Sequence, residues 1–259
     1  MTEVAARPVV SADLGGVLRL YRVALRRCWP PSALLALLWV GLLALLISKL
    51  ALAGDLLSLI AQLQEMMSSS WFWRLVLAAL LVSTWLYCAI VAAIHGVATG
   101  AAHVPGADFR SAVRLFPRAL VAGTLFFALT SIGTLVFVVP GIYLWGMWQL
   151  WVVALVAEHH GPLQSLSTSW NLTRGFWWPA TSVVTLATIV TMVPLLVSNA
   201  LVSTLLALLG LPPAQALIVS LLALAVVTTL VAPLIPAALV AIYLVRQRAM
   251  TAHPVIVHV

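Results

Sequence analysis

The sequence predicts an all-α, polytopic membrane protein with six transmembrane helices, and three observations support this. Hydrophobic residues make up 64% of the 259 residues and charged residues only 7%, whereas about a quarter of the residues in soluble domains are charged. Apolar runs long enough to cross about 30 Å of hydrocarbon, which takes about 20 helical residues, recur along the whole chain. Turn signals separate these runs. We therefore expect residues 1–259 to form a single integral membrane domain.

Helical periodicity between turn residues places the six spans in order. They cover about residues 32–53, 71–95, 119–139, 142–157, 178–209 and 214–245. Pro140 and Gly141 predict a tight reversal between the third and fourth spans. The fifth and sixth spans are longer than a membrane requires, since 32 residues form about 48 Å of helix. We expect tilt, or kinks at Pro194, Pro233 and Pro236, to absorb the excess.

The distribution of basic residues predicts the orientation. With a cytoplasmic N-terminus, only Lys49 and Arg74 lie outside, and all the other basic residues lie inside. The inside set is Arg7, Arg19, Arg22, Arg26, Arg27, Arg110, Arg114, Arg118, Arg174, Arg246 and Arg248. Loops this short obey the positive-inside rule. The sequence therefore predicts that both termini, including the tail at 246–259, are cytoplasmic.

A repeated stretch precedes two of the spans. "ADLGGVLRLY" (Ala12–Tyr21) and "ADFRSAVRLF" (Ala107–Phe116) share Ala, Asp, Arg and Leu at aligned positions. As helices, both carry an apolar face and a basic stripe, which is typical of helices lying in the membrane interface. A weaker third copy, Pro162–Trp170, precedes the fifth span. The predicted unit is thus an interfacial helix followed by a transmembrane hairpin, used three times.

The basic stripes are candidate sites for anionic lipid headgroups. Their arginines are Arg19, Arg22, Arg26 and Arg27 within the N-terminal amphipathic segment (1–31), and Arg110, Arg114 and Arg118 in the second copy. Each basic residue near an anionic surface contributes about 1 kcal/mol, so four arginines on the first helix would contribute about 4 kcal/mol. One more amphipathic segment, Asp55–Met67, is expected on the outer face.

A longer motif lies between the fourth and fifth spans. The residues of "PGIYLWGMWQLWVVALVAEHHGPLQSLSTSWNLTRGFWW" that carry it are Pro140, Gly141, Tyr143, Glu158, Gly161, Pro162, Ser169, Trp170, Thr173, Arg174 and Gly175. With "LRLYR" near the N-terminus, this pattern resembles the YciC-like family of bacterial inner-membrane proteins and the related membrane domain of some glycerophosphoryl diester phosphodiesterases. The resemblance implies six membrane helices in a bacterial inner membrane and supplies no established activity. The catalytic barrel of some relatives takes roughly 250 residues, and we expect none among these spans.

The densest polar cluster is Glu158, His159 and His160, which the predicted topology places at the same surface as His95, His103 and Asp108. Carboxylate and imidazole together suit zinc or divalent iron. A solvated helix end is the interpretation we favour, because no pair has the i, i+4 spacing of a helical metal site. The two cysteines, Cys28 and Cys88, show no metal-binding spacing and are predicted to pack in the interior.

The fourth span offers a candidate cavity. Trp145, Trp148 and Gln149 share a helical face and could line a cavity for a flat or acyl ligand, with Gln149 as its polar group. Asn199, downstream of Pro194, could mark the unwound point of a broken transporter helix. The same side chains could instead fill helix interfaces. No ionisable residue lies in the middle of any span, which disfavours an ion-coupled pump.

These observations predict a non-enzymatic protein of the inner membrane, associated with membrane lipids, with anionic lipid favoured, or with envelope maintenance. We expect no cofactor, no metal and no nucleic acid partner, and the sequence identifies no protein partner. The alternative is a small transporter or exporter of an uncharged or amphipathic molecule. A third class, an intramembrane enzyme, would require Glu158 and His159 to face a cavity.

Overall fold

The structure, a computed structural model, describes residues 11, 13–50, 56–102, 104, 106–210 and 212–252. Regular secondary structure within these residues is entirely α-helical, and six helical segments are long and apolar enough to cross a membrane. The predicted fold class is therefore confirmed. Several positions named above lie outside the described residues: Arg7, Ala12, residues 51–53, Asp55 and His103.

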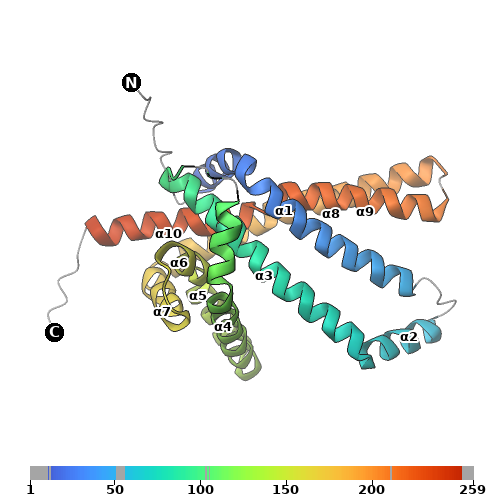
Figure 1. Ribbon diagram of the computed structural model, residues 1–259, viewed down its shortest axis with the longest axis horizontal. Helices are drawn as coiled ribbons and strands as arrows, with labels where there is room; N and C mark the ends of the chain where they lie inside the picture. Colours follow the sequence, from blue (N-terminus) through green and yellow to red (C-terminus); the bar gives the residue numbers. More distant parts are fainter. Residues whose placement is uncertain are drawn as a thin grey trace.

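The first hairpin is formed by α1 (Leu14–Leu50) and α3 (Ser70–Thr99), with the short α2 (Leu56–Ser68) at its tip. The helix α2 corresponds to the amphipathic segment expected on the outer face. Pro30 and Pro31 lie inside α1, so the amphipathic segment and the first span form one continuous helix rather than two. Figure 1 shows this helix changing direction part-way along its length, as proline within a helix promotes.

The second hairpin pairs α4 (Ala107–Val136) with α5 (Val138–Trp148) and α6 (Trp151–Glu158). Here too the amphipathic segment and the span are continuous, through Pro117. The prediction of a reversal at Pro140 and Gly141 is wrong. The chain reverses at Phe137, which is extended (φ −158°, ψ 142°), and Pro140 lies in the first turn of α5, where a missing N–H costs no helical hydrogen bond.

The third hairpin follows the same order, but its amphipathic segment and its first span are separate helices. The amphipathic helix is α7 (Pro162–Thr173), and the hairpin consists of α8 (Trp177–Leu208) and α9 (Pro213–Val231), followed by α10 (Leu234–Ala252). The excess length is handled in two ways: α8 runs through Pro194 as one helix, whereas the predicted sixth span is interrupted just before α10. In Figure 1 α10 points away from the α8–α9 hairpin.

The buried core lies where the hairpins and α10 meet. Buried side chains gather in the first half of α1, the second half of α3, the first half of α4, and in α6 and α10, whereas the outer parts of the hairpins bury few side chains. In Figure 1 the hairpins diverge from this region. Alanine is the commonest residue of the core, which fits membrane packing, because small residues let helices approach closely where the hydrophobic effect supplies no driving force. Cys28 and Cys88 are both buried there, as predicted.

The buried faces of the amphipathic helices differ from the predicted ones. In the amphipathic part of α1 the buried side chains Val17, Leu20, Ala24 and Cys28 are centred beside the predicted apolar face, which they share at Val17. That predicted face consists of Leu14, Val17, Leu18, Tyr21 and Leu25. In α7, Leu163 is 71% exposed, although the third repeat placed it on the apolar face. These helices pack on other helices of the protein, and their neighbours decide which side is buried.

Candidate functional site

An ion pair joins the first two hairpins. The Nε and Nη2 atoms of Arg27 in α1 donate to the two carboxylate oxygens of Asp108 in α4, both at 2.8 Å. The Nη1 atom donates to the carbonyl of Ala101 beyond the end of α3, at 3.3 Å. The two paired side chains are only 10% and 14% exposed. Arg27, predicted to bind a headgroup, therefore links three helices inside the protein.

A glycine makes room for this ion pair. A methyl group added at Gly96 in α3 would lie 2.9 Å from both terminal nitrogens of Arg27, so an alanine there would displace the guanidinium from this position. The repeated Asp residues have different roles: Asp108 pairs with Arg27, whereas Asp13 accepts from the amide of Gly16 at 2.8 Å and caps α1. The Ser11 hydroxyl and this amide lower the pKa of Asp13, which favours its charged form.

Two further arginines hold helix ends. Arg118 donates to the carbonyl of His159, at 2.8 Å, just after the end of α6. Arg246, which the sequence analysis used only for orientation, donates to the carbonyl of Leu172 in α7 at 2.9 Å and lies 4.9 Å over the ring of Phe176. A cation near a helix C-terminus is favourable because the last carbonyls carry partial negative charge. These arginines thus stabilise connections between helices.

The remaining arginines of the two stripes stay at the surface. They are Arg19, Arg22, Arg26, Arg110 and Arg114, all exposed. Arg19 has one long contact, 3.4 Å to the Ser11 hydroxyl, and the other four make no hydrogen bond or ion pair with the described residues. Because the Arg27–Asp108 pair holds the start of α4 against α1, both stripes lie at the same end of the molecule.

The polar cluster at the end of α6 is internally paired. Glu158 accepts a hydrogen bond from the hydroxyl of Tyr243 in α10, and its other oxygen lies 2.8 Å from Nδ1 of His160. The ring of His95 packs edge-on against Tyr243, with 6.5 Å between centroids. His159 caps α6 in the left-handed conformation (φ 54°). Among the described residues no three His, Cys, Asp or Glu side chains converge as metal ligands do.

The fourth span is broken between α5 and α6, and a serine from α7 bridges the break. The buried Ser169 hydroxyl donates to the carbonyl of Met147 at 3.0 Å and accepts from the amide of Leu150 at 3.1 Å. Non-helical backbone at membrane depth is tolerated only when its polar groups are satisfied in this way. Next to it, Trp170 packs against Trp148, with ring centroids 5.9 Å apart. The Ser-Trp pair of the motif is therefore a structural support.

Of the four residues considered for a cavity, two line one in the structure and two do not. A cavity of about 970 Å³ lies between the first two hairpins, and both Trp145 and Gln149 line it. Trp148 is not in its lining because it packs against Trp170, and Asn199 lies exposed on the α8–α9 hairpin. Gln149 is 6% exposed, and neither polar atom of its amide has a hydrogen-bond partner. An unpaired buried amide costs about 1–3 kcal/mol, so this position is costly for the fold.

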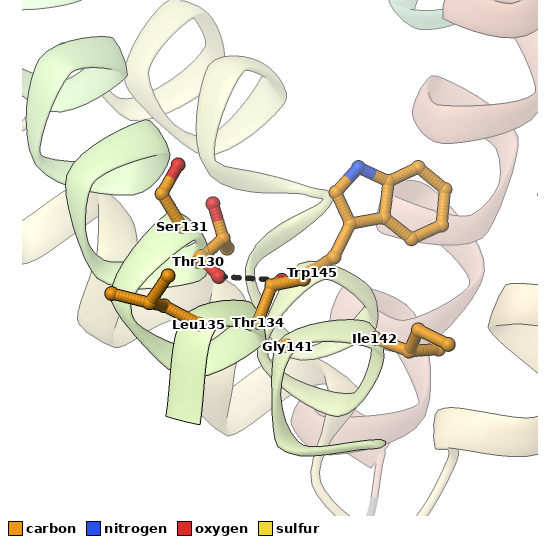
Figure 2. A pocket seen from close by; sticks show the side chains of 7 residues that line it. All are labelled: Thr130, Ser131, Thr134, Leu135, Gly141, Ile142 and Trp145. Atoms are coloured by element: carbon orange, nitrogen blue, oxygen red, sulfur yellow. Dashed lines mark hydrogen bonds between the residues drawn. The ribbon is translucent and has the colours of Figure 1, made fainter. Parts of the chain in front are cut away.

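A second, smaller hollow of about 550 Å³ lies where α4 and α5 pack together (Figure 2). The Thr134 hydroxyl beside it donates to the carbonyl of Thr130, at 2.8 Å, which satisfies it within its own helix. Gly141 lies against Thr134, and an added methyl group would be 2.7 Å from the Thr134 Cα atom. The Pro-Gly motif thus provides close helix packing instead of a turn.

No family model, curated protein or solved structure matches the chain. The resemblance to the YciC-like family therefore stays a prediction, and the function is argued from the site itself.

Proposed function

We propose that this is a non-enzymatic, multi-pass protein of the bacterial inner membrane that binds anionic lipid at its cytoplasmic end. The observation that carries the proposal is the surface formed by Arg19, Arg22, Arg26, Arg110 and Arg114. These five exposed arginines lie at one end of the molecule, and none of them forms an ion pair with the described residues. Arginine beside a membrane surface binds phosphate groups through several donors at once.

The contribution of the α1 arginines to lipid binding is smaller than the sequence alone suggests. Since Arg27 is paired with Asp108, three arginines of α1 remain for lipid instead of four. At about 1 kcal/mol each, they contribute about 3 kcal/mol, which is roughly a hundredfold in affinity. The positive-inside asymmetry supports a cytoplasmic position for this surface and for both termini. The apolar hairpins hold the protein in the membrane independently of these charges.

The proposal assigns no catalysis to Glu158, His159 or His160. Both carboxylate oxygens of Glu158 are occupied, by Tyr243 and by His160. None of the three residues lines the cavity between the first two hairpins or the hollow between α4 and α5. Their contacts support a role in joining α6 to α10, and the third class considered above, an intramembrane enzyme, has no observation in its favour.

The test is lipid retention after Arg19, Arg22 and Arg26 are changed together to Gln. Purified protein is exchanged into nanodiscs containing phosphatidylglycerol and phosphatidylcholine, and bound lipid is measured by native mass spectrometry at low and high salt. We expect the variant to enter the membrane normally but to lose preference for phosphatidylglycerol, with a smaller difference at high salt because salt screens exposed charges.

The matched control changes Lys49 and Arg74, the basic residues at the opposite end, to Gln. This variant should retain phosphatidylglycerol as the wild type does. Unchanged retention by the triple variant at low salt would show that the arginines determine topology only, and the lipid-binding proposal would fail.

A second candidate, a transporter of an uncharged or amphipathic molecule, is favoured by one observation. The cavity between the first two hairpins lies beside the break in the fourth span, as binding sites do in transporters with discontinuous helices. Transport across proteoliposomes is the measurement that would separate this candidate from static lipid association.

A further inference from the structure

The cavity between the first two hairpins is bounded by α1, α3, α4 and the α5–α6 break, with Val184 of α8 and Ile235 and Leu239 of α10 completing its wall. Along α3 its wall runs from Leu77 to Cys88, which is about 17 Å of helix. Its lining is mostly apolar and aromatic, with a few hydroxyl groups and the amide of Gln149, and contains no Asp, Glu, Lys, Arg or His. A bound molecule must therefore be uncharged over the part that enters, because an unpaired charge there would be strongly disfavoured.

The cavity opens toward the lipid-facing surface. Side chains at its edge are among the exposed apolar residues, including Trp39 (43% exposed), Leu80 (50%) and Phe127 (67%). In a membrane such side chains contact acyl chains, so the medium around the opening is hydrocarbon. The occupant consequently enters sideways from the bilayer and has a long apolar part.

Two polar groups in the lining lack partners. Both amide atoms of Gln149 and the hydroxyl of Ser83 are buried without a hydrogen bond. Gln149 follows the start of α5 at Val138 by eleven residues and precedes Glu158 by nine, about 16 Å and 14 Å of helix. These groups lie near the membrane midplane, where phosphate headgroups do not reach.

We propose that this cavity binds a neutral long-chain lipid that bears a hydroxyl group. The hydroxyl both donates and accepts, which matches the donor and acceptor that the Gln149 amide offers. Gln149 lines the cavity, and both atoms of its amide are buried without a partner, so binding requires the amide to turn toward the ligand. This site is distinct from the arginine surface, and it stands whether or not that surface binds lipid.

The experiment compares oleyl alcohol with its methyl ether, which has the same chain but no donor. Binding to delipidated protein in detergent is measured by native mass spectrometry for the wild type, Gln149→Leu, Ala128→Trp and Asn199→Leu. Ala128 lines the cavity at an exposed position, so tryptophan there fills the cavity without disturbing the core. Asn199→Leu is the control outside the cavity.

We expect the wild type and Asn199→Leu to bind the alcohol about tenfold more tightly than the ether, the ratio that one hydrogen bond of about 1.4 kcal/mol gives. Gln149→Leu should fold and bind both ligands equally, since it removes the amide but keeps the apolar wall. Ala128→Trp should bind neither. Equal binding of the two ligands by the wild type, or normal binding by Ala128→Trp, would overturn the proposal.

Discussion

The ion pair between Arg27 and Asp108 gives the sharpest test of the fold. We consider Arg27→Met, which is close to arginine in volume, and Asp108→Leu, which is larger than aspartate; each removes one charge. In the native protein the pair has two charge-assisted hydrogen bonds of 2.8 Å between side chains no more than 14% exposed. Such bonds contribute about 1.5–3 kcal/mol each, and the buried position limits screening by solvent.

Each single substitution should lower the free energy of unfolding by about 3–5 kcal/mol, because it leaves the other charge buried without a partner. The double substitution should cost no more than either single one, since replacing a buried pair by apolar groups is often close to neutral. The coupling energy should therefore be at least about 3 kcal/mol, the cost of one single substitution that the double substitution avoids. Arg26→Met, at the exposed neighbouring arginine, should change stability by less than about 0.5 kcal/mol.

The measurement is reversible unfolding in mixed micelles, with increasing sodium dodecyl sulfate, followed by tryptophan fluorescence and circular dichroism. Additive effects of the two single substitutions, with no coupling energy, would refute the assignment of Arg27 as the link between α1, α3 and α4. The prediction depends on no functional assignment.

Two more substitutions test the helix contacts by the same unfolding assay. Ser169→Ala should lower the free energy of unfolding by about 1–3 kcal/mol, because two backbone groups at the α5–α6 break lose their partner. The control Ser182→Ala, at an exposed serine bonded within its own helix, should cost little. Equal effects of the two substitutions would contradict the bridging role of Ser169. Gly141→Ala should lower the free energy of unfolding by about 1–3 kcal/mol through overpacking against α4. The control Gly41→Ala, with nothing within 4 Å of the added methyl group, should be neutral or slightly stabilising. A tolerated alanine at Gly141 would mean that α4 and α5 do not touch there.

The six spans were predictable because each leaves a long apolar pattern in the sequence. The breaks were predictable only in part. Pro233 marks the interruption before α10, as expected, but the break at Gln149 and Leu150 has neither proline nor glycine to signal it. A partial signal was available in the sequence, because Ser165, Ser169 and Thr173 recur every four residues along α7. Of these three, Ser169 alone bonds to the backbone at the break, whereas Ser165 donates to Pro162 within its own helix and the Thr173 hydroxyl is buried without a partner.

The roles of the arginines were not predictable from their pattern. Arg26 and Arg27 are adjacent in the same basic stripe, yet one is exposed and the other is paired with a residue that lies 81 positions later. Local periodicity identifies a polar face but does not show which of its members meets another helix. The cavity was predicted from Trp145 and Gln149, whereas Asn199 was misplaced because the position of the third hairpin depends on tertiary packing.

Cysteine accessibility tests directly whether the exposed arginines and both termini face the cytoplasm. Single cysteines are placed at Ser69 and Pro213, near the tips of two hairpins, and at Ala107 and Gln164, at the start of α4 and in α7, in a background without the native cysteines. An impermeant maleimide added to intact cells should label the first two positions and not the last two. Labelling of Ala107 and Gln164 but not of Ser69 and Pro213 would contradict the orientation and, with it, the assignment of the arginine surface to the cytoplasmic leaflet.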